Sequence, residues 1–321
     1  MNYTYMGTTG LKVSKLCLGT MNFGCGTPKE DAFKIMDAAL DAGINFFDTA
    51  NNYGFLTGDM GITEKIIGEW FAQGGGRREK TVLATKVHED MNQPNDGPNG
   101  APGLSTYKIR RHFEGSLKRL QTDHIEVYYM HHIDRHAPVD EMLATFENLY
   151  ERGLIDYVGA SNFPAWQLAR YQGEARARKF LGISVEQDKY NLMSRLPELE
   201  LLPAVEGLGI GFTPWAPLNG GLLAGKAKDS LRRNMGMSEA TRLQLEQFSK
   251  LCGESGIKES HMALAWLLAD DRVTAPIIGA RTVEQFQDTL KVMDVKLDQE
   301  ILTELDRIFP GPGIAPETYA W

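Results

Sequence analysis

Cysteine is scarce in this chain: there are three among 321 residues, an odd number with no Cys-x-x-Cys pair. That usage argues against a disulfide framework. The chain also lacks any apolar stretch long enough to cross a bilayer, and residues 1–7 lack the basic and apolar regions of a signal peptide. We therefore expect a cytoplasmic protein that does not associate with membranes.

Basic runs are missing as well. Lys and Arg number 34 against 42 for Asp and Glu, which gives a net charge of −8. Without a basic patch, the chain has little with which to hold nucleic acid or an anionic membrane. We expect a small-molecule substrate instead. The oligomeric state is left open, because no apolar stripe marks an interface.

The chain also lacks a glycine-rich turn after its first predicted strand, and this absence decides between two α/β folds, a doubly wound sheet and a (β/α)8 barrel. Eight short, apolar, β-branched segments alternate with amphipathic segments, as in parallel sheets buried on both faces. A doubly wound sheet would carry a G-x-G-x-x-G turn after its first strand, and residues 18–24 (LGTMNFG) do not supply it. The pattern therefore predicts one (β/α)8 TIM barrel over residues 1–321. Predicted strands cover 15–18, 44–47, 81–85, 125–130, 157–159, 183–185, 210–213 and 274–278; predicted helices cover 31–40, 62–71, 107–120, 139–152, 164–178, 238–255, 261–268 and 282–293.

Two insertions interrupt the short connections. Residues 88–105 (HEDMNQPNDGPNGAPGLS) are rich in Pro, Gly and Asn, and residues 217–236 contain the run NGGLLAGK. Both follow predicted strands, so we expect them at the C-terminal face, where such barrels build their sites. A disordered surface loop is the alternative for residues 92–103.

Ionisable residues close three successive predicted strands. Asp48 follows the second strand and Tyr53 lies five residues on, while Lys86 and His131 follow the third and fourth strands. A phenol titrates near pH 10, and a close ammonium such as that of Lys86 favours its ionised form. Asp48 would hold Lys86 charged. His131 would bind the same substrate oxygen as Tyr53.

This set predicts proton delivery to an oxygen that gains negative charge, as when hydride reaches a carbonyl carbon. Each residue alone has a simpler explanation. An Asp after a strand usually caps the next loop, and a His can be a satisfied polar group of the core. Four such residues at the ends of neighbouring strands favour a catalytic site.

The chain carries no hydride donor of its own, so the chemistry calls for a cofactor such as a nicotinamide. Ser161 and Asn162 after the fifth strand and Gln187 after the sixth are suited to hydrogen-bond its carboxamide. Trp215 is placed to stack on the ring, with ordinary packing between Pro214 and Pro217 as the alternative.

Two segments are suited to phosphate. Backbone groups at Leu218–Leu222 can approach a pyrophosphate closely, because Gly220 and Gly221 present no side chain. Gly279 and Arg281 lead from the eighth strand into a helix, whose N–H groups and dipole favour phosphate. Arg281 is placed for an extra phosphate, hence NADPH over NADH; a solvated Arg at a helix start is the alternative.

In this order, the motifs resemble those of the aldo-keto reductases nearly from end to end. Residues 5–14 (YMGTTGLKVS) resemble the N-terminal hairpin of that family and 18–20 (LGT) its first strand. Residues 48–54 (DTANNYG), 85–86 (TK) and 128–131 (YYMH) resemble its tetrad segments. Residues 158–163 (VGASNF), 214–218 (PWAPL) and 278–281 (IGAR) resemble its cofactor segments.

The resemblance implies a barrel with a short N-terminal β-hairpin that binds extended NADP(H) without a Rossmann fold. It implies Tyr53 as the general acid, tuned by Lys86 and Asp48, with His131 orienting the carbonyl. It also suggests Gln285 and Asp288 at the adenine end, where the family commonly has Asn after the acidic residue and this chain has Thr289. The implied cofactor contacts are Ser161, Asn162, Gln187, Trp215, Pro217, Leu218, Gly220, Leu222, Lys226, Gly279, Arg281, Gln285 and Asp288.

Residues 310–321 (PGPGIAPETYAW) resemble the tail of bacterial, particularly actinomycete, members. That group includes NDP-hexose 2,3-enoyl reductase-type enzymes of sugar pathways, so enoyl reduction is one alternative to carbonyl reduction. His131 argues against it, because family members that reduce a steroid enone carry Glu at that place. The other alternative is a redox-sensing interaction module similar to the channel β-subunits of this superfamily.

Overall fold

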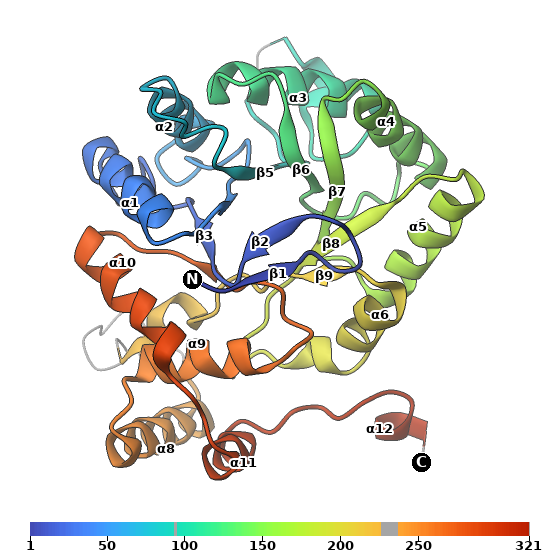
Figure 1. Cartoon of the computed structure of the whole chain (residues 1–321). Helices are drawn as coiled ribbons and strands as arrows, with labels where there is room; N and C mark the ends of the chain where they lie inside the picture. The colour runs from blue at the N-terminus through green and yellow to red at the C-terminus, as the bar shows by residue number, and fades with distance from the viewer. Residues whose placement is uncertain (93–94, 226–236, 321) are drawn as a thin grey trace.

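The computed structural model describes residues 1–92, 95–225 and 237–320. Its centre is a parallel eight-stranded sheet wound into a barrel (Figure 1), with the strands in chain order around it. The strands are β3 (Cys17–Gly19), β4 (Phe46–Asp48), β5 (Val82–Val87), β6 (Ile125–Met130), β7 (Ile155–Ser161), β8 (Ile183–Gln187), β9 (Gly211–Phe212) and β10 (Ile277–Ile278). Strand β10 pairs with β3. On its other side, Thr274 N–H donates to Phe212 C=O over 2.8 Å and Ile277 N–H to Pro214 C=O over 2.9 Å, which closes the circle.

Helices cover the outside of the barrel, as the crossovers between parallel strands require (Figure 1). They are α1 (Lys29–Asp41), α2 (Ile62–Phe71), α3 (Thr106–Leu120), α4 (Val139–Glu151), α5 (Ala165–Ala177), α6 (Leu201–Leu208), α8 (Glu239–Ser255), α9 (Glu259–Ala269), α10 (Val283–Leu290), α11 (Gln299–Ile308) and α12 (Glu317–Ala320). Short 3-10 turns are η1 (Gly97–Gly100), η2 (Leu196–Glu198), η3 (Asn219–Ala224) and η4 (Lys291–Asp294). The barrel prediction is confirmed.

The apolar side chains form two cores, because alternate residues of each strand face opposite sides. Phe47, Leu83 and Tyr128 face outward and pack in the large cluster under the helices. Phe46 and Tyr129 face inward and belong to the smaller cluster that fills the barrel. The inward or outward direction of every strand residue is thereby fixed, including those at the strand ends.

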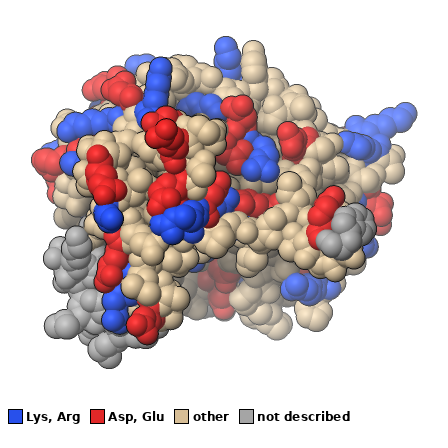
Figure 2. Space-filling view, turned by 90° about the horizontal axis from the view of Figure 1, so that it is seen from below, with Lys and Arg blue, Asp and Glu red and all other residues tan. Residues whose placement is uncertain are grey.

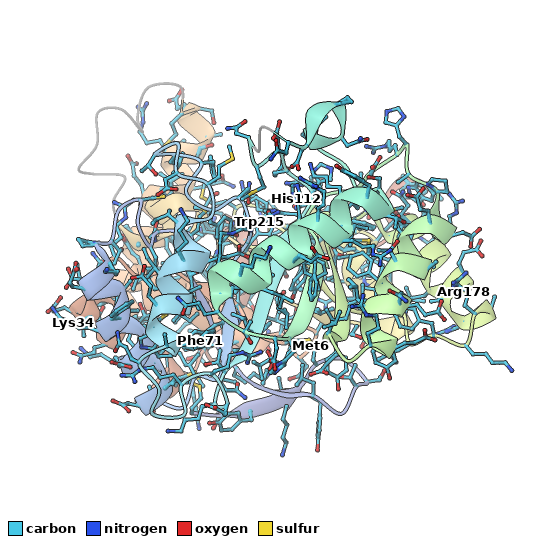
Figure 3. All side chains as sticks on the ribbon, turned by 90° about the horizontal axis from the view of Figure 1, so that it is seen from above. Met6, Lys34, Phe71, His112, Arg178 and Trp215 are labelled. Carbon is cyan, nitrogen blue, oxygen red and sulfur yellow. The ribbon has the colours of Figure 1, made fainter. Side chains whose placement is uncertain are left out.

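An antiparallel hairpin, β1 (Tyr3–Tyr5) with β2 (Lys12–Ser14), lies across one end of the barrel (Figure 1). Its connection buries Met6 and the second strand buries Val13, both fully, in the inner cluster. In Figure 3, Met6 lies toward this end, while Trp215 and His112 lie toward the opposite one. The hairpin thus plugs the N-terminal face and leaves the C-terminal face for the loops that follow the strands.

Charge is mixed on the surface. Figure 2 shows acidic and basic side chains interspersed on one face, with no large area of a single sign there.

No helix among residues 1–92, 95–225 and 237–320 has the length and apolar character needed to cross a membrane. All three cysteines are free thiols, with Cys17 and Cys252 buried.

Candidate active site

The tetrad predicted from the sequence is built on the alternation of the barrel strands. Inward-facing Phe46 is followed two residues later by Asp48, and inward-facing Ala84 is followed by Lys86. Tyr129 is followed in the same way by His131. Asp48 and Lys86 are therefore the last inward positions of β4 and β5, and His131 continues the same alternation one residue past the end of β6.

Lys86 is the centre of this group, and its side chain is fully buried. Its ammonium donates to Asp48 Oδ2 over 2.6 Å, to Thr49 C=O over 2.8 Å and to Tyr53 Oη over 3.2 Å. Three donors meet three acceptors, so a buried charge is fully paired, as its burial requires. Burial acts to lower the pKa of Lys86, yet Asp48 and Tyr53 together hold that pKa above its ordinary value.

Tyr53 stands in the loop between β4 and α2, which turns back on itself at this point. Tyr53 N–H donates to Ala50 C=O over 3.2 Å, and Gly61 N–H donates to Tyr53 C=O over 3.0 Å. Burial raises the pKa of the phenol, and the opposing effect of Lys86 is smaller. From the sequence, Lys86 was expected to lower that pKa; desolvation outweighs the ammonium, so the pKa of Tyr53 is raised instead.

His131 faces Tyr53 edge to face, with ring centroids 6.2 Å apart. Burial, and then the charge of Lys86, hold the pKa of His131 well below its ordinary value, so the imidazole is neutral at neutral pH. A neutral ring beside a protonated phenol suits hydrogen bonding to an uncharged carbonyl oxygen.

Gln187 sits at the end of β8 in the same inward layer. Its Nε2 donates to Asp48 Oδ1 over 2.8 Å, so both carboxylate oxygens of Asp48 are bound. The contact predicted between Gln187 and a nicotinamide carboxamide stays a prediction. What the structure adds is a second support for Asp48.

Asn162 joins two of the predicted cofactor segments, 158–163 and 214–218, to the tetrad segment that ends at His131. It has a left-handed φ of 60° at the end of β7. Its Nδ2 donates to His131 C=O over 3.1 Å and to Ser161 Oγ over 2.9 Å. Its Oδ1 accepts from Trp215 Nε1 over 3.1 Å. The indole predicted to stack on a ring is therefore held in place by Asn162, and it lies toward the same end of the molecule as His112 (Figure 3).

The predicted phosphate segments lie at the same end of the barrel. Within η3, Gly220 and Gly221 have φ of 66° and 95°, values that favour glycine, and Leu218 and Leu222 flank them. Pro217 precedes this turn and is buried. Lys226 lies outside the described residues.

Helix α10 follows Gly279 and Arg281 and begins at a side-chain cap. Thr282 Oγ1 accepts from Gln285 N–H over 3.2 Å, and Gln285 Oε1 accepts from Arg281 N–H over 3.1 Å. Arg281 and Gln285 are exposed. Gln285 is thus engaged in capping, and its adenine contact stays a prediction.

Asp288, one turn further along α10, borders a cavity of about 610 Å³ between the ends of α8, α9 and α10. Its carboxylate accepts from Lys258 over 2.9 Å and from Lys291 over 3.1 Å. Lys258 and then Lys291 lower the pKa of Asp288 to about 2. Ala224 of η3 also lines this cavity, which connects it to the predicted pyrophosphate turn.

The partners that surround these residues were not predicted from the sequence. Asn51 contacts His112 and His112 contacts Asp96, while Glu89 lies between His88 and His132. A signal existed for His112, which falls three residues after Ile109 on the apolar face of its helix. The contacts themselves join residues far apart in sequence and carry no local pattern. No cluster able to hold a metal ion occurs among the residues that the structure describes.

This chain belongs to the aldo/keto reductase family, whose sequence pattern it matches over residues 15–309. It is 59% identical over 330 residues to the uncharacterized oxidoreductase YrpG of Bacillus subtilis, covering 100% of both chains. It is 33% identical to norsolorinic acid reductase stcV of Emericella nidulans, covering 94% of this chain and 79% of that one. A probable voltage-gated potassium channel subunit beta of Oryza sativa is 31% identical, covering 99% of this chain and 100% of its own.

Family membership and these relatives support an oxidoreductase that acts on carbonyl groups in general. The likeness to actinomycete members drawn from the C-terminal tail is not supported, since the 59% identical relative is from Bacillus.

Proposed function

We propose that this chain is a cytoplasmic NADPH-dependent reductase, a single catalytic unit over residues 1–321, that converts an aldehyde or ketone to an alcohol with Tyr53 as proton donor. One observation carries the proposal. A fully buried ammonium, Lys86, contacts both a buried carboxylate, Asp48, and the phenol oxygen of Tyr53. Such a group lies at the C-terminal mouth of the barrel, where these folds build their sites, and a phenol that acts as a general acid needs a nearby cation to stabilise the phenolate.

The residues divide the chemistry among them. Tyr53 Oη donates a hydrogen bond to the carbonyl oxygen and transfers its proton as the C–H bond forms at the carbonyl carbon. Lys86 stabilises the phenolate that remains, and Asp48 keeps Lys86 charged and in place. His131, neutral and facing Tyr53, orients the carbonyl oxygen. The product is an alcohol, and solvent returns the proton to Tyr53.

The residues present fit a nicotinamide dinucleotide. The glycines at 220–221 present no side chain to a pyrophosphate, and the cavity beside Asp288 has room for a nucleoside. Trp215, fixed by Asn162, would hold the nicotinamide end, and Arg281 at the start of α10 favours the extra phosphate of NADPH. When bound, the reduced nicotinamide supplies the hydride.

The test is NADPH consumption with an activated aromatic aldehyde, for the wild type beside Tyr53→Phe. We expect the variant to lose turnover by about a hundredfold or more, because the proton donor is gone. NADPH binding, measured by protein fluorescence, should persist. Tyr128→Phe is the matched control, because that hydroxyl is buried under the helices with no hydrogen-bond partner among the described residues.

Turnover that survives in Tyr53→Phe would remove Tyr53 as the acid. A wild type that binds NADPH but reduces no carbonyl would contradict the proposed activity. Product analysis then separates the alternatives: a saturated ketone indicates enoyl reduction, and no product indicates cofactor sensing of the kind proposed for channel β-subunits.

A further inference from the structure

The connection between β5 and α3 is anchored to the barrel more strongly than a surface loop requires. Its base is closed by Gly103 N–H, which donates to His88 C=O over 2.9 Å. Lys108 of α3 is buried, and its ammonium donates to the carbonyls of Gly100 and Ala101 over 2.9 and 2.7 Å. The described part of this connection is therefore an ordered element packed against α3.

Asp96, just before η1, continues this anchoring into the interior. Its Oδ1 accepts from Arg111 Nε over 2.9 Å, and its Oδ2 pairs with His112 Nε2 over 3.1 Å. The side chains of Asp96 and His112 are only 4% and 5% exposed, whereas that of Arg111 is 44% exposed. The Asp96 carboxylate is thus held by two neighbouring residues of α3, Arg111 on the solvent side and His112 on the buried side.

His112, the buried partner of Asp96, also contacts the loop that carries Tyr53. Asn51 Nδ2 lies 3.2 Å from His112 Nδ1, and Asn51 is fully buried. An amide N–H can only donate, so Nδ1 is the acceptor and Nε2 carries the proton that His112 donates to Asp96. A neutral imidazole satisfies both contacts. Burial lowers the pKa of His112 and so favours that state.

Asn51 occupies the middle of the short segment that leads from Asp48 to Tyr53. Its N–H donates to Lys86 C=O over 3.2 Å, which ties the backbone to β5 on the inner side. His112 holds the side chain of Asn51 from the outer side. The segment is therefore held between β5 and α3. A shift of His112 would move the phenol of Tyr53 relative to Lys86.

We propose that Asp96, His112 and Asn51 form a positioning chain that couples the β5–α3 connection to the loop of Tyr53 and sets the place of the phenol over Lys86. The inference rests on the proposed function, because it assigns these residues to the precision of that proton donor. The three residues are positioning residues: they act through the backbone of Tyr53. Because the positioning chain ends at Asp96, the place of that carboxylate is linked to the readiness of the acid.

The experiment compares variants that cut the chain with matched variants that leave it intact. Asp96→Ala and His112→Phe cut it, and the phenyl ring keeps most of the buried volume. Asp96→Asn keeps an oxygen that accepts from His112 Nε2. Arg111→Gln removes the outer partner of Asp96 without touching Asn51. For each, kcat and KM for the aldehyde, the NADPH dissociation constant and the folded fraction are measured.

We expect kcat to fall by about tenfold to a hundredfold in Asp96→Ala and His112→Phe, the scale of a misplacement of about 1 Å at a reacting group. NADPH affinity should hold, and Asp96→Asn and Arg111→Gln should stay within about twofold of the wild type. Asn51→Ala combined with His112→Phe should lose no more than the worse single variant, whereas independent losses would multiply.

Hydrogen exchange supplies a readout that does not depend on turnover. Peptides covering residues 49–55 should exchange faster in His112→Phe and Asp96→Ala than in Arg111→Gln. Unchanged exchange there, unchanged kcat in the cut variants, or losses that only follow the unfolded fraction would overturn the positioning chain. A wild type that reduces no carbonyl while residues 49–55 lose protection in the cut variants would reject the proposed function and keep the coupling.

Discussion

At the scale of single residues, burial sets the protonation of the proposed acid and of its neighbour. Burial raises the pKa of Tyr53 above its ordinary value near 10, and burial lowers the pKa of His131 well below its ordinary value. Neither group therefore changes its protonation state between the lowered pKa of His131 and the raised pKa of Tyr53. We predict that the rate constant for carbonyl reduction is flat from about pH 7 to about pH 9 and falls only when Tyr53 ionises above about pH 10.

The direction follows from the sign of each shift. A proton donor is active below its pKa, so the raised pKa of Tyr53 extends activity toward alkaline pH. The lowered pKa of His131 keeps its ring neutral as the pH falls. The measurement is a pH profile of kcat/KM with an aldehyde that does not titrate. A fall centred between pH 7 and pH 9 would show that another group controls proton delivery.

These residues also mark how far the sequence reaches. Asp48, Lys86 and His131 were predictable because each follows a β-prone run, and strand ends of a barrel converge at one face. The direction of the Tyr53 pKa was not predictable, because it depends on how completely the phenol is buried. The contact of Asn51 with His112 spans 61 positions and depends on where α3 packs.

At the scale of elements, the seating of α2 on α3 depends on one glycine. Gly68 lies inside α2, and a Cβ there would overlap the backbone of Arg119 and Leu120 at the end of α3. Backbone cannot yield as a flexible side chain does. We predict that Gly68→Ala lowers the free energy of unfolding by about 1–3 kcal/mol, measured by urea denaturation.

Gly173 provides the matched control inside another helix. It is exposed in α5, and no heavy atom lies within 4 Å of a Cβ placed there. Gly173→Ala should therefore stabilise the protein by up to about 1 kcal/mol, because alanine restricts the unfolded chain without a clash. Equal effects at the two positions would show that α2 is free to move away from α3.

Elements with clear periodicity were predictable, and those without it were not. Residues 62–71 and 125–130 match α2 and β6 to the residue, and the other predicted strands and helices overlap the observed ones. Helix α6 was missed because it has only eight residues with Pro203 inside, which weakens any helical pattern. Helix α11 was also missed, although Asp298 caps its start: Asp298 Oδ1 accepts from Ile301 N–H over 2.8 Å.

At the scale of the whole molecule, the two ends of the barrel have different tasks. The C-terminal end carries the tetrad, Trp215 and the connections that follow the strands. The N-terminal end is sealed by the hairpin, whose buried side chains complete the inner cluster. A barrel of this kind separates substitutions that change chemistry from those that change stability.

Met6 tests that separation. It lies in the connection between β1 and β2, is fully buried and packs in the inner cluster with Phe46 and Val185. Met6→Ala removes apolar contacts and leaves a cavity, so we predict a loss of about 2–5 kcal/mol in the free energy of unfolding. Met21 is 44% exposed, and Met21→Ala should leave that free energy within about 0.5 kcal/mol of the wild type.

The decisive comparison is kcat for the folded fraction of Met6→Ala. Met6 belongs to the inner cluster with Phe46, whereas Asp48 stands two residues further along the same strand, at its C-terminal end. Because the ion pair of Lys86 with Asp48 fixes these two side chains independently of Met6, we expect an unchanged kcat beside a lowered melting temperature. A kcat that falls with stability would mean that the plug and the tetrad form one mechanical unit, and the N-terminal hairpin would then belong to the catalytic machinery.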